Sequence, residues 1–143
     1  MDIDIYKLGE KFNLTESDFV HDVGLSAPIS RYICDKLMIL GYFSMMSEYM
    51  ESVEKNYEEK PLLIVVSKSG ETASILNLCQ KAMLKNVPVI VLTGMKNSSM
   101  ENCSEITFVI KNSNPLDDRG LEKNDFFGNT ILFFEELIEQ YLK

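Results

Sequence analysis

Three hydroxyl side chains stand close together near the middle of the chain, at Ser67, Ser69 and Thr72. Gly70 lies among them, and because it has no Cβ it lets the backbone approach a ligand closely. Hydroxyl groups and unpaired backbone N–H groups are donors that suit an anion such as a phosphate. Residues 67–72 therefore predict an anion-binding turn.

The flanking sequence places this turn between a strand and a helix. Residues 62–66 form a continuous apolar run rich in β-branched residues, which is typical of a strand buried on both faces. After the turn, apolar residues recur at helical spacing: Ile75, Leu78, Cys79, Ala82 and Met83. The first turn of a helix leaves N–H groups without intrahelical acceptors and carries roughly half a unit of positive charge. Plain helix capping explains the same hydroxyls about equally well, because Ser and Thr are favoured N-cap residues.

The motif S-x-S-G-x-T at residues 67–72 resembles the phosphate loop of SIS (sugar isomerase) domains, which bind phosphosugars. The resemblance covers roughly residues 18–142. Residues 24–26 and the helix after them are similar to the family's first glycine–serine turn. Residues 89–93, followed by the serines at 98–99, are similar to its next strand and turn.

The resemblance is strongest with the phosphosugar-sensing domain of RpiR-type transcriptional regulators. The K-L-x-x-x-G ending of a helix in that family is matched by Lys36, Leu37 and Gly41. Two positions depart from the pattern: Asp22 stands where the family usually has glycine, and Met100 where a small residue or proline is more usual. A carboxylate at Asp22 would repel a phosphate and alter the choice of ligand.

The resemblance implies a set of residues that bind the phosphate and the sugar of the ligand. These residues are Ser26, Ser67, Lys68, Ser69, Gly70, Thr72, Ser98 and Ser99. No cofactor and no metal are expected.

The rest of the chain alternates between strand and helix patterns. Strands are expected at residues 18–22, 42–46, 62–66, 87–93 and 106–110, with helices between them and no more than a very short helix near 98–102. Gly41 is expected to end the first of these helices as a C-cap. This alternation predicts an α/β fold: a doubly wound, flavodoxin-like, mainly parallel five-stranded sheet flanked by helices. Ligands of such sheets bind at the carboxyl ends of the strands.

Length and charge limit the further possibilities. A chain of 143 residues suits a single domain, 1–143, in which residues 1–17 form an N-terminal helical extension too short to encode a helix-turn-helix domain. The net charge of −8 argues against direct nucleic-acid binding by this chain, and no apolar run is long enough to span a membrane. With no secretory signal and three widely spaced cysteines, the protein is expected in the cytoplasm.

The final helix suggests a second subunit. From Asp125 to Tyr141 its apolar residues occupy more than one face of the helix. A domain of this size rarely buries such a helix on all sides, so we expect a homodimer with this helix at or near the interface.

Two functions of different class fit these features. The first is a phosphosugar sensor, like the effector domain of an RpiR-type regulator. The second is a phosphosugar aldose–ketose isomerase, in which Glu122 would be the base and His21, the only histidine, the ring-opening acid. The sensor is favoured, because the sequence supplies carboxylates but no arranged catalytic pair.

Overall fold

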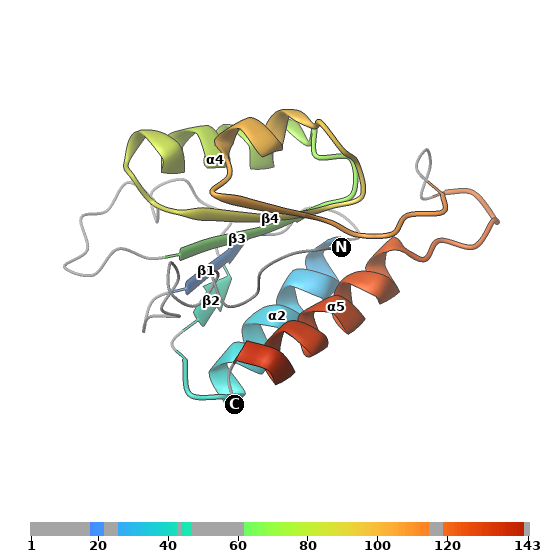
Figure 1. The fold of residues 1–143 in the computed structure, drawn as a ribbon, viewed down its shortest axis with the longest axis horizontal. Helices are drawn as coiled ribbons and strands as arrows, with labels where there is room; N and C mark the ends of the chain where they lie inside the picture. The colour runs from blue at the N-terminus through green and yellow to red at the C-terminus, as the bar shows by residue number, and fades with distance from the viewer. Residues whose placement is uncertain (1–17, 22–25, 43, 47–61, 115–118, 142–143) are drawn as a thin grey trace.

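A parallel β-sheet forms the centre of the molecule, with helices on both of its faces (Figure 1). The computed structural model describes residues 18–21, 26–42, 44–46, 62–114 and 119–141. The five strands are β1 (Asp18–His21), β2 (Ser44–Met46), β3 (Leu62–Ser67), β4 (Val89–Thr93) and β5 (Ile106–Val109). They lie in the order β2-β1-β3-β4-β5, and every neighbouring pair is parallel. The predicted α/β fold, a parallel sheet flanked by helices, is confirmed.

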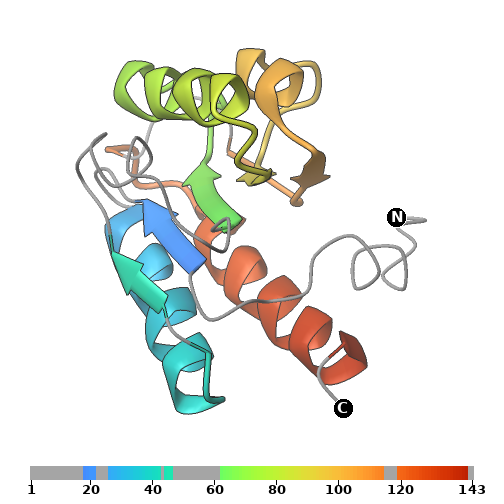
Figure 2. The same cartoon turned by 90° about the vertical axis from the view of Figure 1, so that its left-hand side faces the viewer.

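The helices divide into two layers. These are α2 (Ser26–Ile39), α4 (Ala73–Leu84), the short 3₁₀ helix η1 (Ser99–Cys103) and α5 (Phe126–Tyr141). Figure 2 shows α2 and α5 side by side on one face of the sheet and α4 with η1 on the other. A strand buried between such layers needs apolar residues on both faces.

Strand β3 meets this need by alternation. Leu62, Ile64 and Val66 pack in the cluster formed with α2 and α5. Leu63 and Val65 pack in the cluster formed with α4 and η1. The apolar run in the sequence is continuous because β3 is a central strand that contributes to both halves of the core.

Glycine ends helix α2 as expected. Gly41 has φ +97°, its N–H donates to the carbonyl of Met38, and the N–H of Tyr42 donates to the carbonyl of Leu37. This pair of bonds is the Schellman arrangement, in which a left-handed residue lets the chain turn back and satisfy the last carbonyl groups.

Helix α4 ends in the same way, and the next strand therefore begins later in the sequence. Asn86 has φ +57°, and the N–H of Val87 donates to the carbonyl of Ala82 at 2.8 Å. Val87 is therefore part of the helix end, and Pro88 has no N–H to donate to a neighbouring strand. Strand β4 begins at Val89, two residues later than predicted.

Several expected features lie outside the described residues: the extension at 1–17, the turn at Gly24 and Leu25, and the helix expected between the strands at 42–46 and 62–66. Among the residues that are described, no helix has both the length and the apolar content needed to cross a membrane.

Candidate functional site

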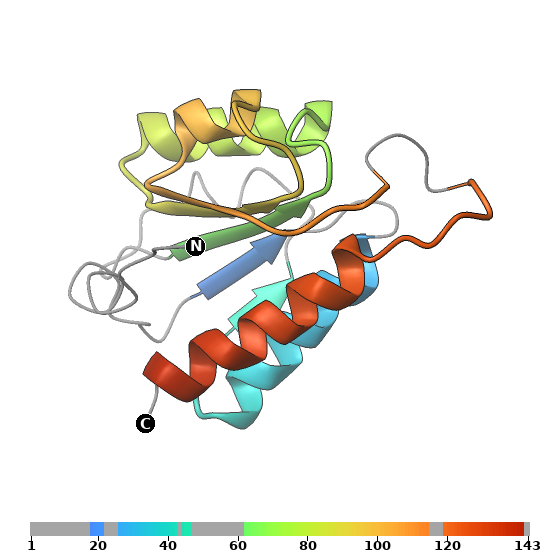
Figure 3. The ribbon, with the colours of Figure 1, turned by 45° about the vertical axis from the view of Figure 1, so that its right-hand side comes forward.

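The hydroxyl-rich turn lies at the carboxyl edge of the sheet, between β3 and α4. Ser67 is the last residue of β3 and is paired in register with Thr93, the last residue of β4. Both side chains are buried. The turns that follow these two strands therefore begin next to each other, as Figure 3 shows at one end of the sheet.

Hydrogen bonds within the turn fix its shape. The Oγ of Ser67 accepts the N–H of Gly70 at 3.0 Å and lies 3.1 Å from the Oγ1 of Thr72. The Oγ of Ser69 accepts the N–H of Glu71 at 3.1 Å. A serine hydroxyl that accepts a backbone N–H still has its own hydrogen to donate. The exposed Ser69 can therefore donate its hydroxyl hydrogen outward.

The amino end of α4 is not capped by its own side chain. Thr72 is the N-cap residue of this 12-residue helix, but it makes no side-chain capping hydrogen bond. Its hydroxyl is turned toward Ser67 instead. The first N–H groups of a helix have no intrahelical acceptor, so this end keeps the donors and the positive dipole that an anion requires.

The turn after β4 is held against this loop by main-chain bonds. The N–H of Gly94 donates to the carbonyl of Lys68 at 3.0 Å, and the N–H of Met100 donates to the carbonyl of Gly70 at 3.2 Å. Gly70 has φ +70°, and a Cβ added there would lie 2.3 Å from the Oγ of Ser98. Only glycine fits this position, because its conformation and its space both exclude a side chain.

Glu71 joins the two turns through its side chain. Its Oε1 accepts the N–H of Ser99 at 2.7 Å. The Ser99 hydroxyl, followed by its N–H, stabilises the charged carboxylate and lowers the pKa of Glu71 below the ordinary value. Glu71 is thus ionised at neutral pH and directed toward the first residue of η1.

Two buried polar atoms near these turns have no hydrogen-bond partner: the Oγ of Ser98 and the Nδ2 of Asn112. Ser98 lies against Gly70, while Asn112 lies against Gly94, whose added Cβ would be 2.6 Å from the Asn112 Nδ2. Unpaired polar atoms are uncommon in protein interiors, and they often mark a functional position.

A model of the SIS domain family matches residues 23–116, which is more than half of the chain. The chain belongs to the SIS domain family.

Relatives of this SIS domain include enzymes. The 3-hexulose-6-phosphate isomerase of Methanocaldococcus jannaschii is 31% identical over 121 residues, an alignment that covers 84% of this chain and 63% of the relative. The chain therefore spans less than two thirds of that isomerase.

Solved structures with the same fold include a domain of a transcription factor. The Vibrio vulnificus NanR protein complexed with ManNAc-6P has a TM-score of 0.80 at 22% identity, with 96% of this chain and 53% of that chain covered. The sugar isomerase domain of an RpiR transcription factor from Sphaerobacter thermophilus has a TM-score of 0.78 at 17% identity, with coverage of 95% and 75%. These two likenesses show the shared fold.

Most of the residues assigned from the sequence come together in this SIS domain. Residues 67–72, Ser98 and Ser99 form one contiguous group at the carboxyl edge. Ser26 is the first residue of α2, and His21 is the last residue of β1 at the same edge, beside Val65. The structure does not describe the side chains of these last two residues.

Glu122 is exposed in the segment before α5, and none of the described hydrogen bonds of the 67–72 loop involves it. In the described part of the chain, no group of three or more His, Cys, Asp or Glu side chains could hold a metal ion.

Sequence reasoning missed three participants at this edge of the SIS domain: Glu71, Thr93 and Asn112. Glu71 occupies a variable position of the motif, and Asn112 reads as one turn former among several. The resemblance includes Thr93 in the family's strand and its threonine and serine turn, but this residue was not among those assigned to the site. Its hydroxyl donates to the carbonyl of Lys68 at 3.4 Å and accepts the N–H of Met95 at 3.3 Å. A polar residue that ends a buried apolar strand is the signal that could have found it.

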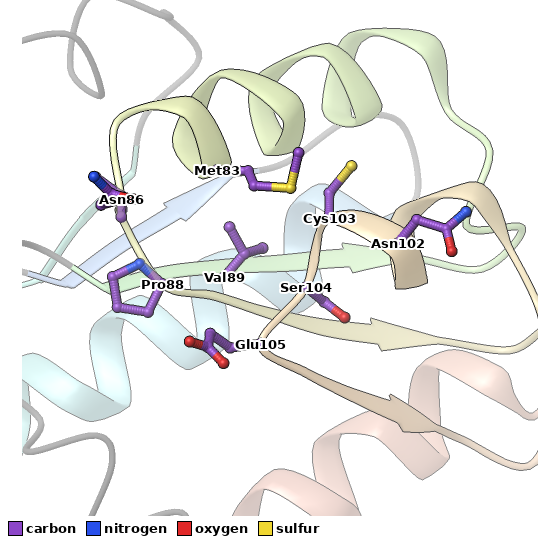
Figure 4. Close-up of a pocket in the computed structure, with 9 residues that line it drawn as sticks. Met83, Asn86, Pro88, Val89, Asn102, Cys103, Ser104 and Glu105 are labelled. Carbon is purple, nitrogen blue, oxygen red and sulfur yellow. The ribbon is translucent and has the colours of Figure 1, made fainter.

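A cleft lies at the opposite, amino edge of the sheet. Its volume is about 250 Å³. Figure 4 shows its lining, which comes from the end of α4, the start of β4, the end of η1 and the residues after it, including Met83, Val89, Cys103 and Glu105. None of its lining residues belongs to the hydroxyl-rich turn, so substitutions can separate the two places.

Proposed function

We propose that this SIS domain binds a phosphorylated sugar and acts as a sensor, like the effector domain of an RpiR-type regulator. The observation that carries this proposal is the amino end of α4, where Thr72 leaves the helix N–H groups uncapped and turns its hydroxyl toward Ser67. Plain helix capping would direct that hydroxyl to the helix. A helix N-terminus whose N–H groups have no side-chain acceptor is suited to bind an anion.

The phosphate would be held by donors from the loop. Ser69 and Thr72 supply hydroxyl hydrogens, and the backbone N–H groups at the start of α4 supply the rest. Gly70 allows the close approach of the ligand, and Lys68, which is half-buried, adds a positive charge in a protein of net charge −8. Ser26, at the start of α2, and Ser98 would complete the pocket on the sugar side.

The sensor class is preferred to the enzyme class because, among the described residues, no hydrogen bond brings a candidate general base to the loop. An aldose–ketose isomerase must move a proton between adjacent carbons, which requires a base held within hydrogen-bond reach of the substrate. Glu122 is exposed and is not bonded to the phosphate loop. NanR, whose fold this chain shares, is a protein complexed with ManNAc-6P.

The isomerase remains the second candidate on one observation. The Methanocaldococcus relative at 31% identity is itself named as a 3-hexulose-6-phosphate isomerase, and its alignment covers 84% of this chain. The discriminating experiment incubates the protein with hexulose and pentose phosphates in deuterated water. Exchange at the carbon next to the carbonyl that disappears in Glu122→Gln would establish the enzyme. No exchange is expected.

Calorimetry tests the binding proposal directly. Fructose 6-phosphate should bind, and fructose without its phosphate should bind far more weakly, because most donors at the site are directed at the anion. Equal affinity for the two compounds would refute a phosphate-directed site.

A further inference from the structure

The carboxylate of Glu71 is in an unexpected place for an anion-binding loop. It follows Gly70 directly, so it brings a negative charge into the loop that would hold a dianionic phosphate. Its Oε1 nevertheless has a defined partner, the N–H of Ser99 at 2.7 Å, on the far side of the turn after β4. The carboxylate is therefore bound to the turn after β4.

The bond between Glu71 and Ser99 is one of two neighbouring hydrogen bonds that join the loop to η1. The preceding residue, Gly70, accepts the N–H of Met100 through its carbonyl at 3.2 Å. Two successive residues of the loop thus bind two successive N–H groups of η1. Between these bonds Gly70 packs against the buried Ser98. With the bond from the Gly94 N–H to the Lys68 carbonyl, the loop after β3 and the turn after β4 are fixed to each other at four points.

We infer that Glu71 is a positioning residue, which holds the 67–72 loop in its phosphate-binding shape by bonding Ser99, and that Ser99 acts through Glu71 and not on the ligand. This inference rests on the proposed function, phosphate binding by the loop. It gives Ser99 a role different from the one that the family resemblance implies, because the carboxylate accepts its N–H at 2.7 Å.

The direction in which the affinity for phosphate changes when the carboxylate is removed distinguishes a positioning role from no role in binding. Two like charges repel, so removing a carboxylate that merely lies near a phosphate should tighten binding. Removing a carboxylate that holds the loop in shape should weaken binding, although the repulsion is also removed. The two roles therefore predict opposite changes of affinity in Glu71→Ala. Glu71→Gln removes the charge but keeps an oxygen that can accept the N–H of Ser99.

Glu101 offers a matched control on the same turn. Its Oε2 accepts the N–H of Asn97 at 2.9 Å, so it makes the same kind of carboxylate–backbone bond. The bond stays within the turn after β4 and does not reach the phosphate loop. Glu101→Ala therefore changes the net charge and the turn in the same way without breaking the connection.

The experiment measures the affinity of the full chain for fructose 6-phosphate and for inorganic phosphate by calorimetry, with thermal unfolding of each variant as a check on folding. We expect Glu71→Ala to bind both probes at least about fivefold more weakly and Glu71→Gln to recover most of the loss. Glu101→Ala should stay within about twofold of the unaltered protein. In spectra of amide protons, the Ser99 signal should move in Glu71→Ala and keep its position in Glu101→Ala.

The possible failures are distinct. If the unaltered protein binds neither probe, the proposed function fails and the inference fails with it. If the unaltered protein binds and Glu71→Ala binds equally well or more tightly, the proposed function stands and the positioning role is wrong. An equal loss in Glu71→Ala and Glu101→Ala would also overturn the inference, because the effect would then belong to the turn in general.

Discussion

Gly70 packs so closely against Ser98 that a Cβ atom on the glycine would lie 2.3 Å from both the Cβ and the Oγ of the serine. Ser98 is only 4% exposed and cannot easily move aside. The backbone of Gly70 also has φ +70°, where side chains are disfavoured. The phosphate loop therefore depends on the absence of one side chain.

Gly70→Ala should abolish measurable binding of fructose 6-phosphate, because the loop must shift to relieve the contact with Ser98. The matched control is Gly41→Ala. Gly41 has φ +97° but nothing within 4 Å of an added Cβ, so this variant incurs only the backbone strain, about 1–2 kcal/mol. Both variants should unfold at lower temperature, and only Gly70→Ala should lose affinity in calorimetry. Normal affinity in Gly70→Ala would mean that the loop does not hold the ligand.

Thr72 should contribute to the affinity for fructose 6-phosphate through its hydroxyl group and not through the shape of its side chain. A hydrogen bond to a charged group contributes ~1.5–3 kcal/mol, so Thr72→Val should weaken binding of fructose 6-phosphate roughly ten- to a hundredfold. Thr72→Ser keeps the hydroxyl and should bind nearly as well as the unaltered protein. If Thr72→Val instead lowers the melting temperature and leaves the affinity unchanged, the hydroxyl serves only the structure of the loop.

The sequence predicts the centre of this molecule well, for a physical reason. Strands β3 and β4 are buried on both faces, so each reads as an unbroken apolar run, and turn residues mark where each one stops. The edge strand β2, Ser44–Met46, was harder to delimit. It pairs with β1 over only three residues, Ser44–Met46, and not over the predicted 42–46.

The candidate site was predictable only in part. Residues 67–72 are contiguous, so their motif is visible in the sequence. The bond from Glu71 to Ser99 joins residues 28 positions apart, and it depends on the register that pairs Ser67 with Thr93 and on the length of the turn after β4. No local pattern encodes such a relationship. The same is true of Asn112, which reaches Gly94 only because β5 lies next to β4.

Self-association should depend on Leu132. Much of the apolar surface of α5 is covered within one copy: Phe134 is 5% exposed and packs in the core with α2. Leu132 is 68% exposed and lines a groove of about 450 Å³ between β5 and α5. If α5 lies at a dimer interface, Leu132→Glu should dissociate the dimer, because a carboxylate without a partner is costly in an apolar contact.

Light scattering at tens of micromolar protein measures this directly. The unaltered protein should show about twice the chain mass of 16.3 kDa, and Leu132→Glu should show the single-chain mass. Leu121→Glu is the control, since Leu121 is fully exposed ahead of α5 and undergoes the same chemical change. A single-chain mass for the unaltered protein would reject the dimer. A dimer that survives in Leu132→Glu would place the interface elsewhere.

The buried thiol of Cys79 should make the stability of the protein fall in alkaline solution. Burial, with a smaller contribution from the Cys103 thiol, raises the pKa of Cys79 from 9.0 to about 12. The unfolded chain loses this proton near pH 9.0, while the folded chain keeps it, so the folded state binds more protons across that interval. The free energy of unfolding should therefore fall by about 1.4 kcal/mol for each pH unit above 9, from this group alone.

Urea denaturation at several pH values, compared between the unaltered protein and Cys79→Ala, isolates this effect. Cys79→Ala leaves a small cavity between α4 and the sheet and should be less stable at neutral pH, where the thiol is protonated in both states. Above pH 9 the stability of the unaltered protein should fall more steeply, so the two curves should converge. Lysines and tyrosines titrate in both proteins and cancel in the difference. Curves that stay parallel through this range would show that the thiolate forms in the folded protein as readily as in the unfolded chain, and that α4 does not seal Cys79 from water.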